Sequence, residues 1–245
     1  MSVLLARWRR PAPPLRLASV ARTHVGRVRT VNEDRLLDRP DRGLWAIADG
    51  MGGHSAGDVA AQTAVAALAA LADDDARITA ATIATALHDA GARIAAGPAP
   101  GGTTIVALHL DGTTATVIWA GDSRCYLLRD GACRQLTRDH SVVQELVDAG
   151  LLDPADAARH PRGHVITRAL GVQPAPDLAR VTVEVRAGDA LFLCSDGASR
   201  ALVDRDFLPR EPLDTAADRL LTAALQRDGS DNISLILVSL PDAAA

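Results

Sequence analysis

Short apolar runs joined by Asp-Gly turns are the feature that most limits how this chain can fold. They follow one another closely between residues 103 and 136. The expected strands are 103–110, 113–120, 124–129 and 132–136, and the turns contain Asp111-Gly112, Gly121-Asp122 and Asp130-Gly131. Asp-Gly favours the tight turns of β-hairpins, so successive runs are expected to pair antiparallel. We therefore expect an antiparallel meander.

Outside this meander, helical and extended patterns come in blocks rather than in alternation. Hydrophobic periodicity predicts helices at 55–72, 76–96, 141–149 and 214–227, and further strands at 15–24, 43–48, 179–185, 189–195 and 232–239. This order indicates a layered α+β domain rather than a doubly wound parallel sheet. Hydrophobic residues make up 48% of the chain but aromatic residues only 2%, so Ala, Val and Leu must fill the core.

Length and composition limit the classes of protein to which the chain can belong. Its 245 residues show no repeat or long linker, so we expect one domain over 18–245. Residues 1–17 are basic and rich in Pro, and we expect a mobile tail there; a tether to a membrane or partner is the alternative. No apolar run reaches the ~18 residues of a membrane span, and Arg and Pro interrupt any signal-peptide core.

Net charge and cysteine content narrow the class of protein further. Thirty acidic and 26 basic residues leave a net charge of −4, which gives no reason to expect nucleic-acid binding. Cys125, Cys133 and Cys194 show no metal-binding spacing. We expect them to be small buried residues of a cytoplasmic protein.

Acidic residues recur where apolar strands end, beside Gly or Ser. Asp49 follows LWAIA, Asp122 follows TVIWAG, Asp196 follows ALFLCS and Asp231 precedes NISLILV, while Glu33 and Asp34 form a further acidic pair. A single Asp-Gly is usually a turn, and Glu33 with Asp34 alone fits a solvated loop. The joint pattern is more informative, because buried carboxylates are costly without partners and only arginines are available nearby.

Divalent cations would compensate such a group of acids. Carboxylate, main-chain carbonyl and water oxygens are the ligands that suit Mg²⁺ or Mn²⁺. In the segment AIADGMGGHSAGDVAAQ (46–62), Gly50 would let a carbonyl approach a cation held by Asp49, and Gly52 and Gly53 would let the chain leave without crowding it. The segment matches neither a P-loop nor a dinucleotide-binding fingerprint.

These segments resemble the metal-dependent protein phosphatases of type 2C in their bacterial form. The similar segments occur in the family's order and extend from about residue 18 to 239. They are VGRVRTVNEDR (25–35), IADGMGGHSAGDVAA (47–61), GGTT (101–104), AGDSRCYLLRDG (120–131), LTRDHSVVQELVDAG (136–150), ITRALG (166–171), GDALFLCSDGASRAL (188–202) and SDNISLILV (230–238).

The resemblance implies a fold and a set of roles. The fold is a four-layer α-β-β-α sandwich, with two antiparallel sheets flanked by helical pairs. Two core ions, Mn²⁺ or Mg²⁺, are implied, and a third, weaker site. In the implied roles Asp49 bridges the two core ions, Gly50 contributes its carbonyl, Asp196 and Asp231 bind the first ion, Glu33 and Asp34 hold waters on the second, Asp122 binds the third, and Arg29 binds phosphate. The stretch from Thr137 to His164 corresponds to a mobile flap.

The implied activity is hydrolysis of phosphoserine and phosphothreonine in proteins. Two ions sharing one water lower its pKa, and the bridging hydroxide attacks phosphorus directly. The cysteines then take no part. Phosphorylated Ser/Thr proteins, and a bacterial Ser/Thr kinase with its substrates, are the implied partners, with no role for membrane or nucleic acid. The alternatives are a non-catalytic phosphoprotein-binding pseudophosphatase of the same fold and, from another class, a metal-dependent nuclease.

Two positions depart from the family pattern. Met51 stands where animal members carry a histidine thought to protonate the leaving group, and His54 is a weak substitute. Arg200 stands where the family usually has an Asp of the third site, so we expect it to weaken binding of a third cation. The alternative is that Arg200 points to solvent.

Overall fold

The structure, a computed structural model, describes residues 17–52, 56–98, 101–157, 159–172, 177–203, 206–207 and 211–241. Its strands are β1 (Ala18–His24), β2 (Asp34–Arg39), β3 (Leu44–Met51), β4 (Gly102–Thr103), β5 (Ile105–Asp111), β6 (Thr114–Ala120), β7 (Arg124–Arg129), β8 (Ala132–Gln135), β9 (Ala179–Glu184), β10 (Ala190–Cys194) and β11 (Ile233–Ser239). Its helices are α1 (Ala56–Asp73), α2 (Ala80–Ala95), α3 (Val142–Asp148), α4 (Pro154–Ala157), α5 (Asp196–Ser199) and α6 (Leu213–Arg227), with a 3₁₀ turn, η1 (Pro40–Arg42).

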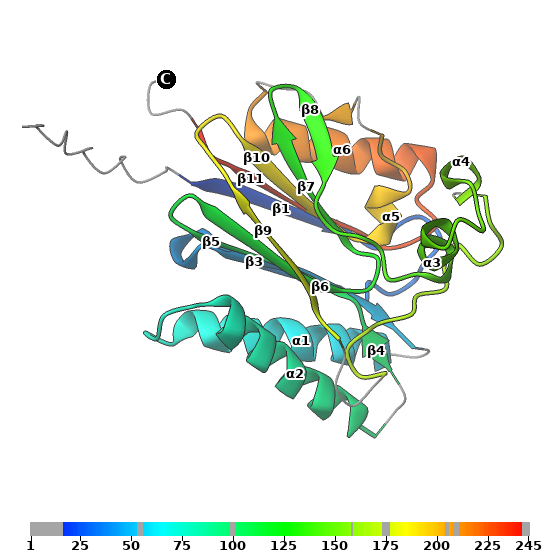
Figure 1. Ribbon diagram of the computed structural model, residues 1–245, viewed down its shortest axis with the longest axis horizontal. Coiled ribbons are helices and arrows are strands. Elements are labelled where there is room, and N and C mark those ends of the chain that lie inside the picture. Colours follow the sequence, from blue (N-terminus) through cyan, green and yellow to red (C-terminus); the bar gives the residue numbers. More distant parts are fainter. Residues whose placement is uncertain are drawn as a thin grey trace, which may run out of the picture.

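The strands form two antiparallel sheets. One has the order β1-β11-β10-β7-β8, and the other has the order β2-β3-β5-β6-β9, with β4 pairing with β3. Helices α1 and α2 cover the outer face of the second sheet, and α6 with the one-turn α5 covers the outer face of the first (Figure 1). The predicted α-β-β-α sandwich is confirmed. The predicted meander is broken at Gly121-Asp122, where the chain passes from β6 in the second sheet to β7 in the first.

Strand β3 shows why the second sheet is buried on both faces, against the first sheet on one side and against α1 and α2 on the other. Successive side chains of a strand point to opposite faces. Trp45 and Ile47 therefore enter the core between the sheets, while Leu44, Ala46 and Ala48 face α1. All five are fully buried, which explains why this stretch is apolar throughout.

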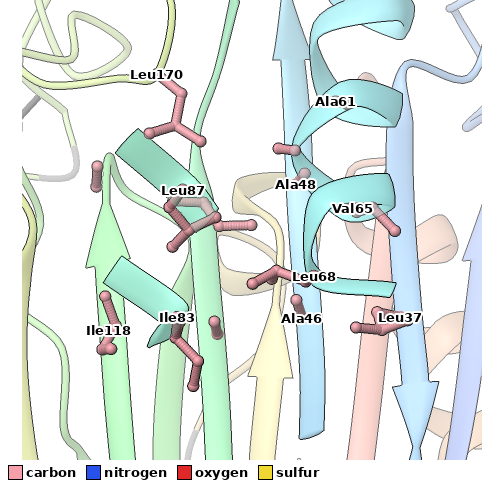
Figure 2. Packing of buried hydrophobic residues seen from close by; sticks show 14 of the residues in the cluster. Leu37, Ala46, Ala48, Ala61, Val65, Leu68, Ile83, Leu87, Ile118 and Leu170 are labelled. Atoms are coloured by element: carbon pink, nitrogen blue, oxygen red, sulfur yellow. The ribbon is translucent and has the colours of Figure 1, made fainter. Parts of the chain in front are cut away.

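Small residues bring α1 close to the second sheet. Ala61 and Val65 of α1 lie over Ala46 and Ala48 of β3, beside Leu68 (Figure 2). Helix α2 adds Ile83 and Leu87 to the same cluster. The alanine-rich composition therefore serves close packing of a helix on a sheet.

The sequence prediction differs from the structure in a few elements. Strand β2 was not predicted, because DRLLDR is mostly charged; its ladder with β3 makes it a strand. Helix α2 begins at Ala80 rather than at 76, because Thr79 caps it by accepting a hydrogen bond from the Thr82 N–H. Leu17, expected in the tail, packs against the core between the sheets, and residues 1–16 lie outside the described part of the chain.

Candidate active site

Five aspartates from separate segments meet at one end of the two sheets, the end near α5 (Figure 1). They lie at the start of β2 (Asp34), within β3 (Asp49), after β6 (Asp122), at the start of α5 (Asp196) and before β11 (Asp231). Asp34 and Asp49 are opposite each other in the β2–β3 ladder. The negative charge of each of the other four raises the pKa of Asp49. The fold thus brings together acids that are up to 197 residues apart, from 34 to 231.

Burial and mutual repulsion raise the pKa of four of these carboxyl groups, those of Asp34, Asp49, Asp122 and Asp196. The pKa of Asp49 lies well above its ordinary value, first because the group is buried and then because Asp34 and Asp196 are close. Burial also raises the pKa of Asp34 and that of Asp122 to about 7, and it raises the pKa of Asp196. The acids at this end of the sheets are therefore only partly compensated, even with Arg29 and Arg200 beside them.

The donor chemistry of the acids fits divalent cations. Oδ1 of Asp34 and Oδ1 of Asp196 are buried and have no hydrogen-bond partner, although buried polar atoms nearly always have one. Within the described residues, no group of three or more His, Cys, Asp or Glu side chains already converges on a metal position. The fit therefore rests on the oxygen donors, the two unpartnered atoms and the raised pKa values.

Hydroxyl groups that the sequence analysis did not single out orient two of the acids. Ser195 Oγ donates to Asp34 Oδ2 at 2.9 Å and accepts from the Ser234 N–H at 3.0 Å. Thr104 Oγ1 accepts from the Asp49 N–H at 3.2 Å, and Thr103 Oγ1 donates to the Asp49 carbonyl at 3.0 Å. For Ser195 the available signal was its position directly before Asp196 in CSDG; GGTT contains no acid, so no such signal marked Thr103 and Thr104.

The loop between β1 and β2 carries Arg29 and Glu33 to the same end. Arg29 Nη2 donates to Asp231 Oδ2 at 2.9 Å, while 54% of the Arg29 side chain stays exposed. The carboxyl carbon of Glu33 would lie 3.1 Å from a Cβ on Gly57 at the start of α1. Arg29 is thus an exposed guanidinium beside the acids, as phosphate binding would require.

The structure gives Gly50 a reason beyond the one inferred from sequence. A Cβ at Gly50 would lie 2.2 Å from the Gly57 carbonyl oxygen and 2.8 Å from that of Glu33. A glycine is therefore required because three backbone segments pack against one another here. Room for a cation was the sequence-based explanation, and the ligand role of the Gly50 carbonyl stays a prediction.

Arg200 does not simply point to solvent. Its Nη2 hydrogen-bonds to Asp196 Oδ2 and lies 4.0 Å from Asp122 Oδ2. It borders a cavity of about 410 Å³. The cavity lies between Asp122 and Asp196 on one side and the segment with α3, α4, His160 and His164 on the other. Arg200 therefore supplies a positive charge between two of the predicted ligands.

Neither Met51 nor His54 provides, within the described residues, an acid that could protonate the leaving group. Met51 ends β3, and its Cε would lie 3.3 Å from a Cβ on Gly102. A thioether has no proton to donate. His54 lies outside the described residues.

Comparison with known proteins identifies the family. The family description Protein phosphatase 2C matches residues 23–234. The chain belongs to the protein phosphatase 2C family. It is 39% identical over 240 residues to the serine/threonine protein phosphatase PstP of Mycobacterium tuberculosis, covering 92% of this chain and 45% of PstP. The chain thus spans less than half the length of that relative.

A second relative in the protein phosphatase 2C family matches nearly end to end. The serine/threonine phosphatase stp of Listeria monocytogenes is 35% identical over 235 residues, which cover 89% of this chain and 93% of stp.

Solved structures of this family have the same fold. A crystal structure of Mycobacterium tuberculosis PstP/Ppp is 39% identical, with a TM-score of 0.83 over 92% of this chain and 99% of that one. The PstP catalytic domain in complex with two manganese ions is 38% identical, with a TM-score of 0.80 over 92% and 99% of the two chains.

None of the helices in the described residues combines the length and the apolar character needed to cross a bilayer.

Proposed function

We propose that this protein is a metal-dependent protein serine/threonine phosphatase. The observation that carries the proposal is the convergence of five aspartates, two of them with a buried oxygen that has no partner, beside an exposed arginine. Membership of the protein phosphatase 2C family supports it, as do the names of the relatives PstP and stp. A structure of PstP with two manganese ions supports Mn²⁺ or Mg²⁺ as the cofactor.

The proposed roles of the residues follow from where each group lies. Asp49 would bridge two ions, with Asp196, Asp231 and the Gly50 carbonyl on one ion and with Glu33 and Asp34 orienting waters on the other. When bound, the ions acidify a shared water for attack on phosphorus and offset the charge of the phosphoryl oxygens. Arg29 would exchange its contact with Asp231 for the phosphoryl oxygens, which a guanidinium binds in a bidentate manner. Ser195 would keep Asp34 oriented through its hydrogen bond.

Hydrolysis of p-nitrophenyl phosphate and of a phosphothreonine peptide tests the proposal. We expect turnover with Mn²⁺, none with EDTA, and none in Asp196→Asn. Binding of the phosphopeptide without turnover would favour the pseudophosphatase alternative. Cleavage of DNA but not of the phosphopeptide would favour the nuclease.

We further propose that Arg200 weakens a third cation site at Asp122. The contact with Asp196 and the 4.0 Å approach to Asp122 support this, since a guanidinium there repels another cation. Calorimetric titration of Mn²⁺ into the wild type, Arg200→Gln and Arg200→Asp separates loss of the positive charge from gain of a ligand. We expect a weak additional site to strengthen in that order. Equal weak-site affinity in all three proteins would contradict the proposal.

The proposed substrates are proteins phosphorylated on Ser or Thr, and the counterpart enzyme is a Ser/Thr kinase. Comparison of the phosphoproteome of a deletion strain with that of an Asp196→Asn strain would identify them. Sites that gain phosphate in both strains are candidate substrates. If no site changes, the proposed partners are wrong even where the purified protein is active.

A further inference from the structure

A single buried amide group, that of Asn232, holds the loop that carries Arg29 and Glu33. Asn232 is only 7% exposed and directly precedes β11. Its Nδ2 donates to the Val25 carbonyl and to the Val31 carbonyl, both at 2.9 Å. Its Oδ1 accepts from the Glu33 N–H at 2.8 Å. All of these contacts join Asn232 to residues about 200 positions earlier in the chain.

The two carbonyls lie at opposite ends of the segment that contains Arg29. Because one NH₂ group binds both, it brings Val25 and Val31 together and closes the intervening residues into a compact loop. Arg29 lies within this closed segment, and its side chain is 54% exposed. The described contacts join the Asn232 side chain to the loop and not to the Arg29 side chain, so the amide group acts on Arg29 through the loop. The Asn232 N–H also donates to Asp231 Oδ1 at 2.9 Å, but this backbone contact does not depend on the side chain.

The chemistry of the three contacts is matched by an asparagine side chain. The loop presents two acceptors and one donor, and an uncharged amide offers two donors and one acceptor. An aspartate of the same shape would keep the bond from Glu33 but set a carboxylate oxygen against two carbonyls. It would also add a negative charge beside Asp231, where acids already repel one another.

Backbone contacts place the closed loop directly against the Asp231 segment. The Arg27 N–H donates to the Gly229 carbonyl at 2.7 Å. Gly26 has a positive φ of 86°, and a Cβ there would lie 2.2 Å from the Asp231 carbonyl oxygen. The loop and the segment 229–232 are therefore packed as one unit, and Asn232 is its polar centre.

We propose that Asn232 is a positioning residue, which orders the Val25–Val31 loop so that Arg29 binds a phosphoryl group. The proposal rests on the proposed phosphatase function for its kinetic consequence. Its structural consequence, a loop ordered by one amide, holds whatever the protein hydrolyses.

Hydrogen exchange of the metal-free, substrate-free protein tests the structural part. We expect both Asn232→Ala and the isosteric Asn232→Asp to speed amide exchange in a peptide covering 25–33. The amide of Glu33 itself should exchange faster only in Asn232→Ala, because an aspartate keeps the oxygen that accepts from it. Asp189→Asn is the matched control, because Asp189 is 2% exposed and lies at the opposite end of the same sheet. It should leave the exchange of this peptide unchanged. Wild-type exchange in Asn232→Asp would overturn the proposal.

A double-mutant cycle with Arg29→Ala tests the kinetic part. We expect Asn232→Asp to raise KM for p-nitrophenyl phosphate and the inhibition constant of inorganic phosphate together, by about tenfold or more. In the Arg29→Ala background the same change should have less than about a twofold effect, because the residues act as one unit. Additive effects would overturn the proposal. An inactive wild type would instead refute the phosphatase function and leave the exchange result standing.

Discussion

Strand β10 has an aspartate near each end, one buried and one half-buried, and the two are held in opposite ways. Asp189, at the start, is fully paired: Arg129 donates to both of its oxygens at 2.8 and 2.6 Å, and the Arg186 N–H donates at 2.8 Å. Asp196, beyond the other end, has one buried oxygen without a partner. Burial raises the pKa of each. At Asp189 the hydrogen bonds from Arg129 and from the Arg186 N–H, together with the charges of both arginines, outweigh burial and hold the pKa below its usual value, while the pKa of Asp196 stays raised.

This contrast shows that burial of a carboxylate does not by itself indicate a functional site. Asp189 is buried and compensated, as expected of a carboxylate that stabilises the fold. Asp196 is half-buried among other acids. Arg200 pairs with its Oδ2, but its buried Oδ1 has no partner within the described residues and its pKa stays raised. A cluster of this kind lowers folding stability and is kept where it binds something positive.

The largest expected effect is the loss of activity in Asp49→Asn. This variant removes the carboxylate proposed to bridge the ions, and an ion's contribution of several kcal/mol corresponds to roughly a thousandfold in kcat. We also expect the metal-free variant to resist urea better than the wild type at neutral pH, since one buried charge is gone. Activity close to that of the wild type would show that Asp49 is structural, like Asp189.

The next effect is on stability at the other end of β10. Asp189→Asn weakens two charge-assisted hydrogen bonds from Arg129 and should lower the free energy of unfolding by about 2 kcal/mol. We expect kcat/KM at moderate temperature to remain that of the wild type. Urea unfolding and phosphopeptide hydrolysis measure the two effects. A loss of turnover without a loss of stability would remove the distinction between the two ends.

The two ends should also respond to pH with opposite signs in the metal-free protein. The pKa of Asp34 and that of Asp122 are raised to about 7 in the fold, so their contribution to stability is present below the unfolded value of about 3.9 and is lost as the pH rises through about 7. The lowered pKa of Asp189 gives a contribution that is present above about pH 3.9 and is lost on further acidification.

Urea unfolding in EDTA across the pH range measures this difference. We expect a free energy of unfolding roughly 2 kcal/mol higher near pH 5 than near pH 8, and Asp34→Asn should reduce that difference. Saturating Mn²⁺ should abolish it, because the ions stabilise the charged carboxylates. Stability that is flat between these pH values would contradict the raised pKa values at the site.

The smallest effect is expected from Ser195→Ala, which removes the hydrogen bond to Asp34 Oδ2. We expect affinity for Mn²⁺ to fall about tenfold, since groups behind a metal ligand typically matter to that extent. Ser199→Ala is the control: Ser199 Oγ donates only to the Asp196 carbonyl in the described contacts, at 3.3 Å. Unchanged Mn²⁺ affinity in Ser195→Ala would show that Asp34 is oriented by the backbone alone.

Local patterns in the sequence were enough to predict much of this protein. Asp-Gly turns predicted hairpins, and β5–β6 and β7–β8 are such hairpins. At Gly121-Asp122 the prediction is wrong, because the chain passes there from one sheet to the other. Acids beside Gly or Ser at strand ends predicted a shared site, and the structure brings these acids together. The two hairpins follow from turn chemistry, which sets local pairing. The gathering of the acids follows from strands that end at one edge of the layered sheets, while their roles as metal ligands stay predictions.

Contacts between distant segments decided the rest. DRLLDR is a strand only because β3 pairs with it, and Gly50 is glycine because the backbones of Gly57 and Glu33 press against it. The choice for Arg200 between solvent and Asp196, and the role of Asn232 across some 200 residues, depend on which groups meet in space. Residue types and their order along the chain determined that a layered α+β sandwich would gather acids at one end. Only the tertiary structure decided which of those acids are compensated, because the energy of a buried charge depends on the partners that folding brings within hydrogen-bonding distance.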